Sequence, residues 1–137
     1  MQPVLQSFAA GLPVLLLHLG VTLAMLAGAV AVYVWTTPHK EFALIREGNN
    51  AAALSLSGAI LGLAIPLAVS LAVSVNVFDI VVWGVLSLVV QIVVFRVVDL
   101  LLRDLPKRID DGEIGPAVVL AAIKLAVALI NAAAVSG

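Results

Sequence analysis

The sequence IREGNNAAALSLSGAILGLAIP, residues 45–66, decides the fold of this chain. It begins with a short polar turn that contains Arg46 and Glu47, and it continues as a run of small and apolar residues. No charged residue follows until Asp79. This run is longer than the roughly 20 residues that a helix needs to cross a bilayer. The stretch therefore predicts a transmembrane helix that starts at a polar connection.

The turn at residues 48–50 has two interpretations. Gly48 is typical of the residue that follows a helix in the left-handed conformation. Asn49 or Asn50 can act as the N-cap of the next helix, because an asparagine side chain accepts hydrogen bonds from the first helical N–H groups. The alternative is a ligand-binding turn, since helix N-termini attract anions. We favour the two caps.

Small residues line one face of the helix that begins there. Ala51, Ser55, Gly58 and Gly62 lie close together on this face. Gly58 and Gly62 form a small-xxx-small pair, which lets another helix approach closely. The sequence leaves open whether that helix belongs to the same chain or to another subunit. Pro66 lacks an N–H for the carbonyl of Gly62, so we expect a bend there.

The composition indicates that lipid, rather than water, surrounds most of this chain. Of its 137 residues 64% are hydrophobic and 11% are charged, whereas globular domains average about 45–50% and 25%. The net charge of −1 argues against a nucleic-acid partner, which would need clustered basic residues. The absence of cysteine excludes disulfides and thiol catalysis.

The distribution of apolar residues predicts an all-α integral membrane protein with one domain, residues 1–137. The predicted spans cover about residues 10–35, 50–73, 80–102 and 115–135. The first 38 residues contain no charge, so the first span lacks the basic start of a cleaved signal peptide and is read as uncleaved. Gly20, Ala24 and Gly28 give it a second close-packing face, and Tyr33 and Trp35 are expected in the headgroup layer.

The two halves of the chain look like a tandem repeat. Repeat one covers about residues 10–73 and repeat two about 76–135, each with a long span, a charged turn and a span rich in small residues. An offset of 64 aligns Gly48 with Gly112 and Gly58 with Ala122. Because each unit has two spans, both units cross the membrane in the same sense, which makes the repeat parallel.

Basic residues predict the orientation. They lie in or beside the first and third connections, whereas the middle connection and both termini have none. The positive-inside rule therefore places those two connections in the cytoplasm and both termini outside. Residues 38–47 are predicted to form a short interfacial helix, with Phe42 and Ile45 toward lipid and with Lys40, Glu41 and Arg46 toward water.

Several motifs together resemble a known family. They are Thr37-Pro38-His39-Lys40-Glu41, residues 45–53, Ser57-Gly58, Gly62, Trp83-Gly84, Gln91 and Ile130-Asn131-Ala132-Ala133. With them the chain resembles, over nearly its whole length, the small bacterial membrane family catalogued as domain of unknown function three-fifty. The resemblance implies an inner-membrane protein built from two tandem two-span units. It implies no established activity.

Lys124 is the most informative single residue, because it lies about nine residues into the fourth span. A charge at that depth is costly and usually faces other helices or a water-filled cavity. Lys124 is predicted to meet Asp99 and Arg96 in an intramembrane polar cluster, with Gln91 on the same span as a further member. We favour a structural lysine that pairs with Asp99, over the wall of a hydrated pathway or a catalytic lysine.

A second polar layer is predicted in the outer half of the spans, with His18, Asn131 and Ser70 at similar depth. Histidine titrates near neutral pH, so His18 is a possible proton relay. We favour an interhelical hydrogen bond from a neutral imidazole. His18 and His39 are expected on opposite sides of the membrane, so no metal site is predicted.

Two functions remain open on this sequence. No nucleophile–base pair or phosphate-binding loop is present, which argues against an enzyme and against a cofactor. The first function is a homo-oligomeric structural or accessory component of the bacterial envelope that recruits a cytoplasmic protein. The alternative is a subunit of an ion or small-solute channel or transporter. The two differ in whether the polar residues of the spans share one hydrated cavity or lie in separate helix contacts.

Overall fold

The computed structural model describes residues 1–37 and 41–137, and all regular structure in these residues is helical. The helices are α1 (Gln2–Thr36), α2 (Glu41–Arg46), α3 (Asn50–Val73), α4 (Val77–Leu101), α5 (Asp104–Asp110) and α6 (Ile114–Ser136). Helices α1, α3, α4 and α6 are long and apolar enough to cross a membrane. The all-α class and the four predicted spans are therefore confirmed.

Helices α3 and α6 form the most extensive helix–helix contact of the fold. A Cβ atom added to Gly58 would lie 2.5 Å from Cβ of Ala121 on α6, and one added to Gly62 would lie 2.7 Å from the ring of Phe95 on α4. Only glycine at these two positions lets α6 and the ring of Phe95 come this close to α3. The structure thus uses the small-residue face of α3 within the chain. Pro66 is buried in the middle of α3, and the helix continues past it to Val73.

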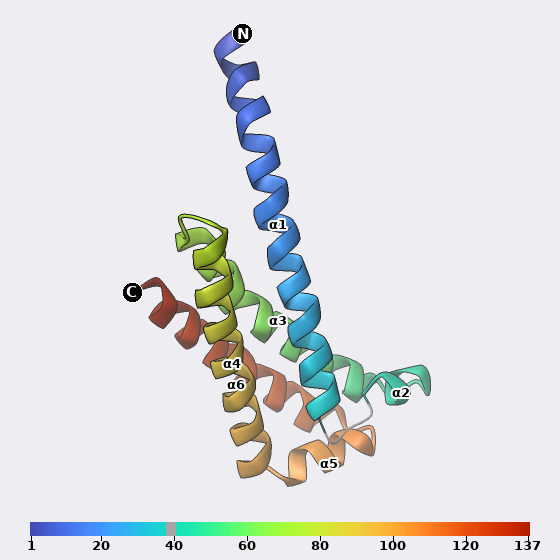
Figure 1. Cartoon of the computed structure of the whole chain (residues 1–137). Coiled ribbons are helices and arrows are strands. Elements are labelled where there is room, and N and C mark those ends of the chain that lie inside the picture. The colour runs from blue at the N-terminus through green and yellow to red at the C-terminus, as the bar shows by residue number, and fades with distance from the viewer. Residues whose placement is uncertain (38–40) are drawn as a thin grey trace.

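Helix α1 packs on the other helices mainly along its second half, and its N-terminal part extends beyond the α3–α4 turn (Figure 1). Its buried residues are Thr22, Ala29 and Tyr33. This face points inward, so the predicted packing face at Gly20, Ala24 and Gly28 is exposed, with nothing within 4 Å of a Cβ added at either glycine. The face is not used within the chain.

The short helices α2 and α5 lie at the same end of the molecule (Figure 1). Two residues after the end of each helix comes a glycine with positive φ, +87° at Gly48 and +85° at Gly112. Asn49 is the N-cap of α3, because its side chain accepts a hydrogen bond from the N–H of Ala52 at 3.0 Å. Its amide also donates to the carbonyl of Ile109 at 3.1 Å. Asn49 therefore connects the two charged turns, while Asn50 is the first residue of α3.

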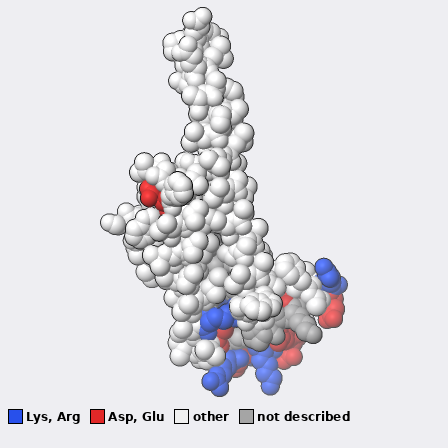
Figure 2. Space-filling view, in the orientation of Figure 1, with Lys and Arg blue, Asp and Glu red and all other residues white. Residues whose placement is uncertain are grey.

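Apart from Asp79 at the start of α4, the charged side chains in this view gather at this end, which we call the charged end (Figure 2). Three sequence predictions about its residues are wrong. Ile45 is half-buried against the core of the bundle rather than turned to lipid. Glu41 is 2% exposed rather than turned to water, because α2 packs against the bundle with that face. Tyr33 is buried rather than placed among headgroups, whereas Trp35 is exposed. The predicted positions of residues 38–40, including His39 and Lys40, lie outside the described residues.

Candidate functional site: an ion cluster at the charged end

Lys124 is almost completely enclosed by protein. Its side chain is 1% exposed although it carries an ammonium group within a membrane-spanning helix. The Nζ atom donates a hydrogen bond to the hydroxyl of Tyr33 at 2.7 Å and lies 3.3 Å from Oδ1 of Asp99. Lys124 thereby connects α6 to both α1 and α4. A buried cation is tolerable only with such partners.

Arg96 completes what we call the ion cluster, Arg96, Asp99 and Lys124. Its guanidinium lies 3.2 Å from Oδ2 of Asp99 and donates to Oγ1 of Thr37 at 2.7 Å. It also stands 4.7 Å from the ring centroid of Tyr33, at the distance of a cation–π contact. One carboxylate is therefore shared between two cations.

Aromatic rings form the wall of the ion cluster toward the middle of the membrane. The rings of Tyr33 and Phe95 meet edge to face with centroids 5.9 Å apart. The ammonium of Lys124 lies 5.0 Å from the first centroid and 5.2 Å from the second. The negative face of an aromatic ring attracts a cation, which applies to Phe95, while Tyr33 contributes through the hydroxyl that accepts the hydrogen bond from Nζ. Both side chains thus help to compensate a charge that lipid cannot solvate. Gly62 leaves the space that the ring of Phe95 occupies.

Glu41 approaches the same region from α2. Its burial raises the pKa of the carboxyl to about 7, against the opposing attraction of Lys124 and Arg96. The atom Oε2 is buried without a hydrogen-bond partner among the described residues. Glu41 therefore titrates near neutral pH beside a cluster that carries a surplus of positive charge.

Gln91 does not join the ion cluster as the sequence suggested. It is completely buried, and its side-chain oxygen accepts a hydrogen bond from Nδ2 of Asn131 at 2.9 Å. The same Nδ2 donates to the carbonyl of Ser87 at 3.3 Å. This amide pair joins α4 to α6 in a contact that is separate from the ion cluster. Gln91 and Arg96 are both on α4, but four residues lie between them.

The predicted outer layer is not brought together. His18 lies on the part of α1 beside the α3–α4 turn, in a groove of about 550 Å³ that Val75 and Phe78 help to line. Within the described residues its imidazole makes no hydrogen bond to Asn131 or Ser70. Ser70 is fully buried, and its hydroxyl makes no hydrogen bond with any of the described residues. The three residues are therefore in three different environments.

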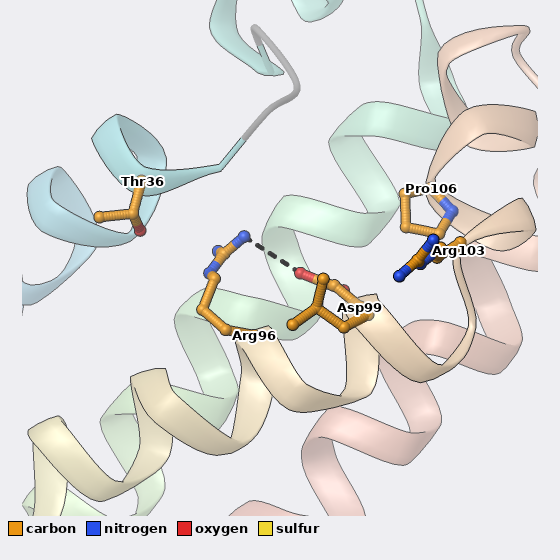
Figure 3. A pocket seen from close by; sticks show the side chains of 6 residues that line it. Thr36, Arg96, Asp99, Arg103 and Pro106 are labelled. Carbon is orange, nitrogen blue, oxygen red and sulfur yellow. Dashed lines mark ion pairs between the residues drawn. The ribbon is translucent and has the colours of Figure 1, made fainter.

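A cleft of about 490 Å³ opens beside the ion cluster, at the point where α1 and α4 end and α5 begins. Its lining residues are Thr36, Arg96, Asp99, Leu100, Arg103 and Pro106. Figure 3 shows Arg96 and Asp99 between Thr36 on one side and Arg103 with Pro106 on the other. Arg96 and Asp99 thus form the side of the ion cluster that is open to this cleft.

The family described as Domain of Unknown Function (DUF350) matches residues 7–135. The chain belongs to this family. It is similar to the UPF0719 inner membrane protein YjfL of Escherichia coli strain K12 and of E. coli O157:H7. Each is 34% identical over 110 residues, which cover 80% of this chain and 83% of the relative. No solved structure gives a significant match.

This DUF350 chain also contains site residues that sequence reasoning missed. Tyr33, Thr37, Phe95 and Glu41 complete the surroundings of the ion cluster. The available signal was the spacing of Ala29 and Tyr33, four residues apart on one face of α1, followed four residues later by its C-cap Thr37. In residues 1–37 and 41–137, no three carboxylates or histidines are grouped so that they could hold a metal ion.

Proposed function

We propose that this DUF350 protein is a non-enzymatic, oligomeric structural or accessory component of the bacterial inner membrane. One observation supports this most strongly: the polar residues of the spans lie in separate helix contacts. Lys124 is 1% exposed and paired with Asp99, Gln91 is paired with Asn131, and His18 is apart from both. A continuous polar pathway would instead need these side chains to share one space.

The proposed orientation places the charged end in the cytoplasm and both termini outside. It rests on the basic residues of that end and on the positive-inside rule, and the inner-membrane location agrees with the name of the E. coli relatives. Because the chain has no native cysteine, single cysteines at Gln2, Glu47, Asp111 and Gly137 can report the orientation. Only those at Gln2 and Gly137 should react with an impermeant maleimide in intact spheroplasts. The opposite pattern would contradict the orientation.

A tandem parallel repeat and a homo-oligomer belong to the same proposal. The repeat is supported by the matching positive-φ glycines, Gly48 and Gly112, 64 residues apart. The homo-oligomer is supported by the exposed face at Gly20, Ala24 and Gly28 on α1. Faces of small residues pack helices together in membranes, and none of the described helices of this chain covers this one, so a second subunit could. Native mass spectrometry should show an oligomer that Gly28→Leu dissociates, whereas a monomeric wild type would contradict it.

A cytoplasmic protein partner would meet the exposed charges of the charged end. Arg46 and Glu47 lie at the end of α2, and Lys107 and Arg108 lie on α5. These side chains are exposed on the surface where Figure 2 shows both signs of charge. A photo-crosslinking amino acid placed at position Glu47 or Asp111 should capture a soluble protein in the cell. Crosslinks to lipid or to the same chain alone would contradict such a partner.

A second candidate is a homo-oligomeric channel or transporter subunit. The observation in its favour is the cleft, which reaches Arg96 and Asp99 directly in front of Lys124. Charged residues beside a hydrated cavity are a common feature of ion pathways. This candidate requires that the buried ion pair opens or that a subunit interface extends the cleft across the membrane.

Ion flux into liposomes separates the two candidates. We expect purified wild-type protein, Lys124→Ala and Lys124→Glu to show no more flux than empty vesicles at varied pH and voltage. Native mass spectrometry of the same samples must show the wild-type oligomer. Flux that is absent in empty vesicles and changes in size or ion preference with Lys124 would overturn the accessory function and establish a conduit.

A further inference from the structure

The cleft beside the ion cluster lies where the apolar spans meet the charged end. Thr36 is the last residue of α1, Arg103 follows the end of α4, and Pro106 belongs to α5. Figure 3 shows the side chains of these elements around the cleft. The cleft is therefore at the depth at which lipid headgroups meet a membrane protein.

The cleft carries more positive than negative charge. Two of its lining residues are arginines and one is an aspartate. The carboxylate of Asp99 is already shared between Lys124 at 3.3 Å and Arg96 at 3.2 Å. Arg103 makes no ion pair or hydrogen bond with any residue in the described ranges, and it is exposed. An anion in the cleft would find an unpaired guanidinium at Arg103.

An apolar surface continues from the cleft toward the middle of the membrane. Leu100 lines the cleft and is 63% exposed. Val97 and Val93, three and seven residues earlier, lie on the same face of α4 and are also exposed. The site thus combines cationic groups at the headgroup level with an apolar strip at the acyl-chain level.

We propose that this cleft binds an anionic phospholipid. Its phosphate meets Arg103 and the edge of Arg96, and one acyl chain lies along Leu100 and Val97. A guanidinium suits this ligand because its planar fork donates two hydrogen bonds to phosphate oxygens. Basic pockets at the cytoplasmic side of transmembrane helices recognise anionic headgroups in the same manner. The inference goes beyond the accessory function and does not depend on it.

Binding can be measured by native mass spectrometry on the delipidated full-length protein in detergent. The probes are phosphatidylglycerol, zwitterionic phosphatidylcholine with the same acyl chains, and soluble glycerol phosphate. The variants are Arg103→Gln and, as a matched control, Arg46→Gln. Arg46 is also exposed at the charged end, at the end of α2, and it does not line the cleft. Leu100→Gln tests the apolar strip.

We expect the wild type to retain phosphatidylglycerol in preference to phosphatidylcholine. Arg103→Gln should lower the affinity for phosphatidylglycerol about five- to tenfold, the effect of losing one favourable contact with an anionic headgroup. Leu100→Gln should lower it to a smaller extent, and Arg46→Gln should leave it unchanged.

Three results would overturn the proposal. Equal losses in Arg103→Gln and Arg46→Gln would show diffuse surface attraction. Unchanged binding in Arg103→Gln, with the wild-type melting temperature, would show that the cleft is not the site. Binding of glycerol phosphate as tight as that of phosphatidylglycerol would identify a soluble phosphate compound rather than a lipid.

Discussion

The two ends of this bundle hold polar groups in the membrane by different means. At the charged end, one carboxylate is shared by two cations, and Tyr33 and Phe95 enclose them. Toward the opposite end, one neutral amide pair joins Gln91 and Asn131. Charges must be compensated almost completely when water is absent, whereas amides lose less when a partner is removed. The comparison therefore predicts that the charged end determines how α1, α4 and α6 associate.

Removing the shared carboxylate should give the largest effect. Asp99→Asn leaves the buried Lys124 and the partly buried Arg96 without their common counter-ion. Breaking one partner from a buried ion pair costs about 3–5 kcal/mol. Unfolding of the purified protein in mixed micelles should show this loss, while Asp104→Asn, at an exposed position on α5, should change little. A loss below about 1 kcal/mol would mean that water already reaches the ion cluster.

The pH dependence should be nearly as large and should come from Glu41. Burial raises the pKa of this carboxyl from 4.5 to about 7, so the folded state binds its proton more tightly than the unfolded state. The stabilisation is complete below about pH 4.5 and is lost as the pH rises toward 7. At 1.36 kcal/mol per pKa unit, the loss amounts to about 3 kcal/mol.

Glu41→Gln provides the matched control for this titration. The neutral amide keeps the shape of the side chain but carries no proton to lose, so the difference in stability between pH 5 and pH 8 should shrink by about 2.5 kcal/mol, the part of the loss that falls in this range. Unfolding curves at several pH values measure it. An unchanged pH dependence in Glu41→Gln would assign the titration to another group.

Close packing between α3 and α6 should be sensitive to one methyl group. Gly58→Ala places a Cβ atom 2.5 Å from that of Ala121, so the helices must separate. Overpacking of this kind costs about 1–3 kcal/mol. Gly11→Ala, where the added atom also meets nothing within 4 Å and which lies outside the face at Gly20, Ala24 and Gly28, is the matched control and should be neutral or slightly stabilising. Similar unfolding curves for the two variants would contradict the tight contact.

The amide pair toward the opposite end should give the smallest effect. Hydrogen bonds between transmembrane helices average about 0.6 kcal/mol. Asn131→Leu should therefore reduce stability by roughly that amount, because Gln91 loses its partner but carries no charge. The same unfolding measurement applies. If Asn131→Leu lost as much unfolding free energy as Asp99→Asn, the two ends would not differ in how strongly they stabilise the bundle.

The sequence predicted those features that depend on composition and local spacing. The four spans follow from the length of the apolar runs. The cap at Asn49 and the positive φ of Gly48 follow from the chemistry of helix ends. The contact between Lys124 and Asp99 could be anticipated because the depth of each residue in its span is readable and a buried cation needs a counter-ion.

Features that depend on how helices rotate about their axes could not be predicted. Uniformly apolar helices give no hydrophobic face, so the inward rotation of Tyr33 and the outward rotation of Gly20 and Gly28 were not visible. Gln91 is on the same helix as Arg96, but only the crossing of α4 with α6 pairs it with Asn131. Helix α2 is six residues long, too short for periodicity to show that Glu41 points inward.

The central claim is that Lys124 and Asp99 stabilise the bundle by compensating each other. A double-mutant cycle with Lys124→Met and Asp99→Asn, followed by unfolding in mixed micelles, tests it most directly. Asp99→Asn alone leaves the buried Lys124 and the partly buried Arg96 uncompensated, whereas the double variant leaves only Arg96. We therefore predict that the double variant is more stable than Asp99→Asn, with a coupling free energy above 1 kcal/mol, at the scale expected for residues in contact. Additive losses, to within about 0.5 kcal/mol, would contradict the claim.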